Sequence, residues 1–177
     1  VSGVMRTGEA RALTWSDVHL DGPDPYIDVN KTMSDVTGKG IVVNAPKTKA
    51  GNRTVKLDPI TTQALRHWRA IQGQRLMRRG LTPDVVWTNQ RLTNRISSNQ
   101  PREWLLSAIK DTDVPQINIH GLRHTYITLA VEANIPIKAL QAQIGHDDIN
   151  TTLGVYTAVT KDMRAKTTEL FTSLVNF

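Results

Sequence analysis

Strand-like and helix-like patterns are segregated along this chain, and the change falls at Asp58-Pro59. Before that point, three short segments are rich in Val and Ile and are separated by Gly, Pro, Asn and Lys. They cover residues 26–30, 40–44 and 53–57. Such segments are typical of an antiparallel meander, and residues 9–20 before them are expected to be helical. The segregation predicts an α+β fold, mostly helical, with a small three-stranded antiparallel sheet near the N-terminus.

Capping residues and prolines mark the helices of the second part. Asp58 suits the N-cap of a helix and Pro59 suits its first position. Gly145 suits the position just after a helix end, because glycine readily adopts the left-handed conformation found there. Helices are expected from Pro59, over 102–110, after Pro115, from Pro136 to Gly145, near 150–156 and over 162–175.

Composition excludes several classes of protein. The chain has 177 residues, 39% of them apolar, which suits one globular domain with its own core. It has no Cys, so disulfide frameworks and thiolate chemistry are excluded. No apolar run approaches the roughly 18 residues needed to span a membrane, so a membrane is not an expected partner. A bacterial cytoplasm is the expected location.

The charge of the chain indicates nucleic acid as a partner. Its formal net charge is +6 and its isoelectric point is near 9.8, as is typical of nucleic-acid-binding domains. Residues 61–110 hold nine Lys or Arg and two acids, so this segment carries +7 and the remainder −1. Contacts with the phosphates of a nucleic acid would explain the patch, and a solvated basic helix face is the alternative.

A histidine and an arginine stand three residues apart in His120-x-x-Arg123, so one side of a helix carries both. The guanidinium fork matches phosphate oxygens, and the imidazole can move a proton near neutral pH. The apolar face of this helix is expected to point elsewhere, leaving both side chains open to one ligand. That face is assigned to Leu122, Tyr126, Leu129, Ala130 and Ala133. His124 invites a metal site, but Gly121 stands where zinc proteases carry a glutamate, and no metal is expected.

Further motifs complete a specific order along the chain. They are Arg6-x-x-Glu9, Lys47 with Lys49 between two strand candidates, Gly145-His146, and Tyr156. Together with His120-x-x-Arg123, this order resembles the tyrosine recombinases over nearly the whole chain. The Gly-His stretch and the following Thr151-Thr152 are similar to those of phage and conjugative-element integrases. The resemblance implies that family's catalytic fold and a site-specific recombinase that integrates or excises a phage or mobile element.

The resemblance also implies a role for each site residue. The phosphate is held by Arg6, Arg123, His120 and His146, the departing 5′ oxygen is protonated by Lys47, and the nucleophile is Tyr156. Two guanidiniums can stabilise the developing phosphoryl charge without a metal. Tyrosine has a pKa near 10 in water and needs a base, for which His120 is the candidate. The phosphotyrosine keeps the energy of the broken bond, so no ATP or other cofactor is expected. Lys49 remains an alternative to Lys47 as the acid.

Several side chains have an ordinary structural interpretation. Tyr156 is one of three tyrosines and is the one that follows the Gly-His pair, whereas Tyr126 is expected in the core. Glu9 is expected to form an ion pair with Arg6 and to support it. His19 and His67 belong to no motif and are expected to pack or to lie at the surface. The four tryptophans are expected in the core, with base stacking as the alternative for one of them: Trp15, Trp68, Trp87 and Trp104.

Two features depart from the family pattern. Gly3 lies three residues before Arg6, where the family's turn glycine is two before, which affects the local geometry of the arginine. The chain also starts close to Arg6, so residues 1–177 are expected to be a single catalytic domain without the upstream core-binding and arm-binding domains.

The expected partner is double-stranded DNA with specific recombination sites, bound by a homotetramer. An apolar stripe near the C-terminus is expected to dock in trans within that tetramer or to fold back in cis; it comprises Leu170, Phe171, Leu174 and Val175. A DNA-binding remnant without strand transfer and a type IB topoisomerase remain alternatives.

Overall fold

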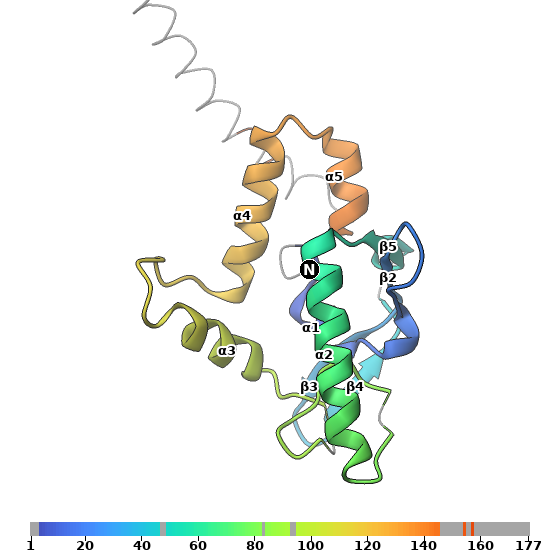
Figure 1. Cartoon of the computed structure of the whole chain (residues 1–177). Helices are drawn as coiled ribbons and strands as arrows, with labels where there is room; N and C mark the ends of the chain where they lie inside the picture. The colour runs from blue at the N-terminus through green and yellow to red at the C-terminus, as the bar shows by residue number, and fades with distance from the viewer. Residues whose placement is uncertain are drawn as a thin grey trace, which may run out of the picture.

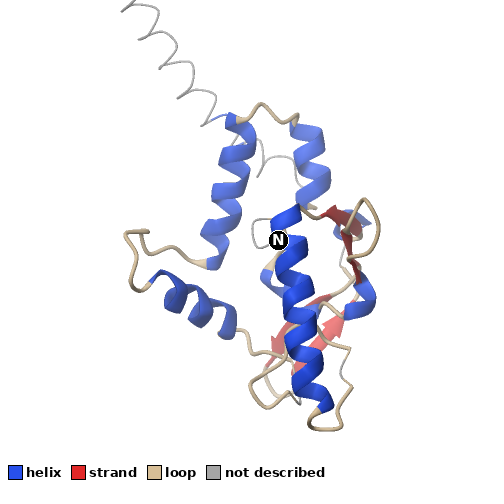
Figure 2. Ribbon diagram, in the orientation of Figure 1, coloured by secondary structure: helices blue, strands red, loops and turns tan. Residues whose placement is uncertain are grey.

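The computed structural model describes residues 4–46, 49–82, 84–92 and 95–145, together with Gly154 and Thr157. The described elements, drawn in Figures 1 and 2, are α1 (Thr7–Ala12), the 3₁₀ turn η1 (Trp15–Asp17), β1 (Val18–His19), β2 (Tyr26–Val29), β3 (Thr32–Val36), β4 (Gly40–Asn44), the 3₁₀ turn η2 (Lys49–Gly51), β5 (Arg53–Lys56), α2 (Pro59–Met77), α3 (Gln100–Ile109), α4 (Ile119–Glu132) and α5 (Ile137–Ile144).

The strands form two small antiparallel sheets. One has the order β1-β2-β5, with Ile27 of β2 opposite Val18 on one side and Val55 on the other. The other is the hairpin of β3 and β4. The three predicted strands are confirmed, but the expectation that they form one meander is wrong. The segment 40–44 pairs with β3 instead. The strand β3 was not predicted, because its residues are polar and largely exposed and lack the alternation of a half-buried strand.

The first helix is shorter than predicted. It ends at Ala12, because Leu13 and Thr14 have extended backbones, and Thr14 caps the short turn at Trp15–Asp17 that leads into β1. The expected helix over 9–20 is therefore wrong beyond Ala12. Gly8 explains how closely α1 packs on β3, since a Cβ there would lie 2.7 Å from the Met33 carbonyl oxygen.

Two clusters of buried apolar side chains hold the described elements together. The first packs the β1-β2-β5 sheet, the start of the chain and α2, with Ile27 and Val55 at its centre. The second joins α4 to α5 through Ile127, Leu140 and Ile144. Tyr126 contacts both clusters, which confirms its expected place in the core.

Three of the four tryptophans pack against the first cluster, and the fourth is exposed. Trp15, Trp68 and Trp87 pack against the first cluster, as expected. Trp104 is 45% exposed. It meets only the edge of Trp87 among the described aromatic rings, with centroids 6.3 Å apart, so its assignment to the core is wrong.

The helices of the second part begin and end where their capping residues predict. Asp58 accepts a hydrogen bond from the Thr61 amide at the start of α2, and Gly145 ends α5 with a left-handed φ of 64°. The helices expected near 150–156 and over 162–175 lie outside the described residues, apart from Gly154 and Thr157, which are helical. None of the described helices combines the length and the apolar content needed to cross a bilayer.

The buried face of α4 differs from the predicted one. Ile127, Ala130 and Val131 are buried, whereas Leu129 is 58% exposed. The same buried face includes Arg123. The expectation that the apolar side points away from this arginine is therefore wrong, because α4 packs on α5 and on the start of the chain through the side that carries it.

Candidate active site

Arg6 stands at the N-cap of α1 and is held by Glu9, as expected. Its backbone amide donates to Glu9 Oε2 at 2.8 Å and its Nη1 to Glu9 Oε1 at 2.9 Å. A carboxylate in the first turn is also favoured by the positive end of the helix dipole. The Nη2 of Arg6 donates to the carbonyl oxygen of Gly145 at 2.8 Å. With 45% of its side chain exposed, Arg6 is anchored but accessible to a ligand.

Arg123, on α4, contacts the same helix end. It lies one turn into α4 and is only 3% exposed. Its Nη1 donates to the carbonyl oxygen of Val4, and its Nη2 to that of Ile144 at 2.5 Å. Arg6 and Arg123, far apart in sequence, thus bind the neighbouring carbonyls of Gly145 and Ile144, immediately before the position of His146 in the chain.

A third guanidinium, that of Arg53, binds the same helix end and the same carboxylate. Its Nη2 donates to Glu9 Oε2 at 2.9 Å, and its Nε donates to the carbonyl oxygen of Gln143 at 2.9 Å. The last carbonyls of a helix lack partners within the helix, and here the carbonyls of Gln143, Ile144 and Gly145 each receive one arginine. The negative end of α5 therefore draws the three cations together.

The charges of this cluster do not balance. Among the residues that the structure describes, three arginines face one carboxylate, that of Glu9, and the partial negative charge of a helix end. Burial acts to raise the pKa of Glu9, but its hydrogen bonds with Arg53 and Arg6 and its attraction to the charge of Arg53 outweigh burial and lower that pKa. Burial, reinforced by the positive charges of Arg6 and Arg53, lowers the pKa of Arg123 to about 10, against the opposite pull of Glu9. Arginine side chains carry a positive charge in proteins, so the described side chains of the cluster sum to an excess positive charge that suits an anion.

His120 lies in the first turn of α4. The Asn118 side chain caps this helix by accepting from the Gly121 amide at 2.7 Å. The imidazole is exposed and meets the ring of His124 edge to face, with centroids 4.8 Å apart. Within the described part of the chain, it forms no hydrogen bond with Arg6 or Arg123. The described ranges also contain no group of three or more His, Asp or Glu side chains arranged to hold a metal ion.

The other expected site residues cannot be placed against this cluster. Lys47, His146 and Tyr156 lie outside the described residues. Lys49, the alternative acid, begins the 3₁₀ turn η2, which leads into the strand of Arg53. Of the six predicted site residues, the structure brings Arg6 and Arg123 together and places His120 on the same helix as Arg123.

Arg53 was not predicted as part of the site. It is separated from Glu9 by 44 residues and from Gln143 by 90, so no local spacing marks it. The available signal was indirect: an arginine opens a strand whose Val55 belongs to the core, next to the loop that carries the two candidate lysines.

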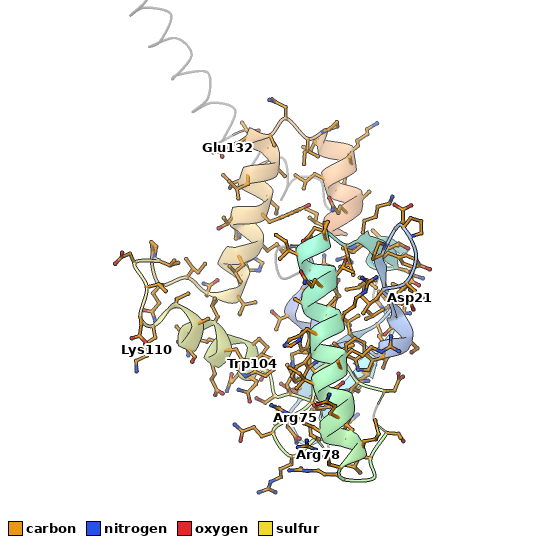
Figure 3. The ribbon with its side chains drawn as sticks, in the orientation of Figure 1. Asp21, Arg75, Arg78, Trp104, Lys110 and Glu132 are labelled. Carbon is orange, nitrogen blue, oxygen red and sulfur yellow. The ribbon has the colours of Figure 1, made fainter. Side chains whose placement is uncertain are left out.

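Many arginines of the basic segment 61–110 have structural partners. Arg66 donates to the Leu20 carbonyl oxygen, Arg69 lies 5.3 Å from the centre of the Trp15 ring, and Arg95 donates to the Ala12 carbonyl oxygen at 2.8 Å. Figure 3 shows Arg75 and Arg78 at the C-terminal end of α2, and Lys110 where α3 ends. Apart from Arg95, which is half-buried, the cations of this segment remain exposed, and their contact with phosphates stays a prediction.

The chain is similar in sequence to proteins of a known family. The model of the phage integrase family matches residues 1–163. A XerC-like tyrosine recombinase of Caldanaerobacter subterraneus is 25% identical over 182 residues, covering 96% of this chain and 46% of that protein. The integrase of Staphylococcus phage L54a is 29% identical over 164 residues, covering 90% of this chain and 46% of that protein. The chain spans about half the length of these curated relatives.

Solved structures show the same fold. The integrase of transposon Tn1549, in complex with circular intermediate DNA, matches with a TM-score of 0.68 and 24% identity, over 96% of this chain and 57% of that one. The XerA recombinase matches with a TM-score of 0.65 and 21% identity, over 93% of this chain and 53% of that one. The expected α+β catalytic fold is thus confirmed. With that fold and a family match over most of its length, the chain belongs to the phage integrase family.

Proposed function

We propose that this chain is the catalytic part of a site-specific DNA recombinase that integrates or excises a phage or mobile element through a 3′-phosphotyrosine intermediate. The observation that carries the proposal is the meeting of Arg6 and Arg123 at the end of α5. This places the two arginines of the motif beside each other and directly before His146 in the chain. Relatives named integrase and tyrosine recombinase support the same activity.

In the proposed reaction, the Tyr156 oxygen attacks the scissile phosphorus and the bond to the 5′ oxygen breaks. His120 takes the tyrosine proton, and Lys47 gives a proton to the leaving 5′ oxygen. Attack by a 5′ hydroxyl on the phosphotyrosine reverses these steps and joins a new strand. The broken and formed bonds are of equal kind, so the reaction balances without ATP.

The arginine cluster supplies the electrostatic part of this mechanism. Arg6 is exposed enough to donate to a phosphoryl oxygen while Glu9 holds its other edge. Arg123 is bound to backbone carbonyls without DNA, and a phosphate oxygen is a stronger acceptor than a carbonyl because it is charged. We therefore propose that, when DNA binds, Arg123 exchanges its contact with the Ile144 carbonyl for one with the phosphate. His146 is proposed to bind the same phosphate.

The remaining parts of the proposal concern assembly. Residues 1–177 are proposed to form one catalytic domain that acts on double-stranded DNA carrying specific recombination sites. The active form is proposed to be a homotetramer in the bacterial cytoplasm, linked through the C-terminal segment. The DNA complexes of the Tn1549 integrase support DNA as the partner.

A nicked suicide DNA substrate tests the proposal with the protein in its full natural length. The wild type should give a denaturant-resistant adduct joined through a 3′-phosphotyrosine, in the absence of metal and ATP. The Tyr156→Phe variant should form no adduct and should bind DNA nearly as well, because only the nucleophilic oxygen is lost. Arg123→Ala should form the adduct about 100- to 1,000-fold more slowly, since loss of one such donor commonly costs about 2.7–4 kcal/mol.

The adduct site decides between the alternatives. An adduct mapped to Tyr126 or Tyr26, or one that persists in Tyr156→Phe, would refute the assignment of the nucleophile. DNA binding without any adduct on an authentic site would identify a DNA-binding remnant instead.

A further inference from the structure

Arg53 uses its whole guanidinium group within the protein. Its Nε donates to the Gln143 carbonyl, its Nη1 to Glu9 Oε1 at 3.2 Å and to the Gly51 carbonyl at 3.4 Å, and its Nη2 to Glu9 Oε2 and to the Val4 carbonyl at 3.3 Å. These five contacts match the five N–H donors of an arginine. The side chain is 6% exposed. Arg53 therefore has no donor left for a DNA phosphate and cannot bind the substrate as Arg6 can.

The partners of Arg53 are also the partners of the two proposed catalytic arginines. Glu9 holds Arg6, and the Val4 carbonyl accepts from Arg123. Gln143 immediately precedes the two residues whose carbonyls bind Arg123 and Arg6. One guanidinium thus links the start of the chain, α1, β5 and the last turn of α5.

Gly145 shows how tightly this link is packed. A Cβ on Gly145 would lie 2.6 Å from Arg53 Nη1 and 2.9 Å from the Ala50 carbonyl oxygen. Real Cβ atoms essentially never approach other atoms to under 3.0 Å. Two features therefore favour glycine before His146. Its left-handed φ of 64° is one that residues with a Cβ rarely adopt, and the Arg53 guanidinium leaves no room for a Cβ.

We propose that Arg53 is a positioning residue for strand cleavage: it aligns Glu9 and the end of α5 so that Arg6 and Arg123 present their guanidiniums to one phosphate. This inference rests on the proposed recombinase activity. A lysine in its place would keep the positive charge but would offer three donors from a single point, which cannot reproduce the planar fork. Displacements of about 1 Å at a site that must align reacting groups commonly cost about 100-fold in rate.

The test compares Arg53→Lys with a matched control, Arg11→Lys. Arg11 is also a buried arginine, 4% exposed, and binds both a carboxylate, that of Asp35, and a backbone carbonyl, that of Ile96. The full-length protein and both variants are assayed at a temperature at which circular dichroism shows all of them folded. The first readout is the single-turnover rate of adduct formation at saturating DNA, and the second is the affinity for DNA.

Arg53→Lys should lose about 100-fold in adduct rate. Its DNA affinity, and the adduct rate of Arg11→Lys, should stay within about threefold of the wild type, a change of about 0.65 kcal/mol. An Arg53→Lys rate no lower than that of Arg11→Lys would overturn the proposal. If Arg53→Lys does not fold, Gly145→Ala displaces the same guanidinium, and a wild-type rate in that variant would overturn the proposal.

Failure of the recombinase activity itself would look different. The wild type would then form no adduct on an authentic site, and crystal structures would decide the role of Arg53. The role of Arg53 in strand cleavage would fall with the activity, and only its alignment of Arg6 with the end of α5 would remain to be tested. That alignment is supported if Arg53→Lys moves the Arg6 guanidinium away from the Gly145 carbonyl, and it is refuted if the contact is unchanged.

Discussion

Glu9 is the carboxylate that pairs with both Arg6 and Arg53, so replacing it should have a direct effect on the stability of the fold. Glu9 is 5% exposed and is the acceptor of two hydrogen bonds from Arg6 and two from Arg53. Replacing it by Gln keeps the size and one oxygen but removes the negative charge. The buried side chains of Arg53 and Arg123 would then lose the one carboxylate that the described residues bring to this cluster. Removing one partner of a buried ion pair costs about 3–5 kcal/mol, so Glu9→Gln should lower the free energy of unfolding by this amount at pH 7.

The effect should depend on pH in one direction. Because the pKa of Glu9 is lowered in the folded protein from its ordinary value of 4.5, its charge stabilises the fold fully above pH 4.5. That stabilisation is lost as the pH falls below 4.5 and through the lowered pKa of the folded state. The difference in unfolding free energy between wild type and Glu9→Gln should therefore be largest near neutral pH and should shrink on acidification.

Urea denaturation of both proteins at several pH values between 7 and 3 measures this difference. Glu132→Gln is the control, since Glu132 is exposed at the far end of α4 (Figure 3) and should change stability by less than about 0.5 kcal/mol. A cost for Glu9→Gln of under about 1 kcal/mol at pH 7 would refute the reasoning. A difference that stays constant down to the lowest pH would refute it as well.

Three further predictions concern the end of α5, the basic segment and the C-terminus. Gly145→Ala should destabilise the fold more than Gly80→Ala, since both glycines have a φ of 64° but a Cβ at Gly80 meets nothing within 4 Å; urea denaturation of the two variants measures the gap, and equal losses would contradict the contact with Arg53. DNA affinity should fall steeply with added salt if residues 61–110 bind phosphates, and an affinity independent of salt in a filter-binding titration would exclude that surface. Deleting the residues after Lys166 should impair assembly on DNA more than DNA contact in native gels, and unchanged recombination by the full-length protein would exclude the docking role.

The sequence alone determined those features that depend on neighbouring residues. Asp58 and Pro59 predict the start of α2, and Gly145 predicts the end of α5, because a helix boundary is set by a few adjacent backbone and side-chain groups. The order of the motifs predicted the family in the same way, since it is a property of the chain itself. The pairing of Glu9 with Arg6 was also predictable, because one helical turn joins them.

Only the tertiary structure decided which strands pair and what each arginine does. The segment 40–44 has the composition of a sheet strand, but its partner is the polar β3. Arg123 was expected to be open and is buried, because the contact that covers it comes from residues 119 positions away. Arg53 carried only an indirect signal, since its role arises from Glu9 and the end of α5, which lie 44 and 90 residues from it. Local patterns specify caps and helices, whereas burial and the sharing of a carboxylate between cations depend on contacts that exist only once the chain has folded.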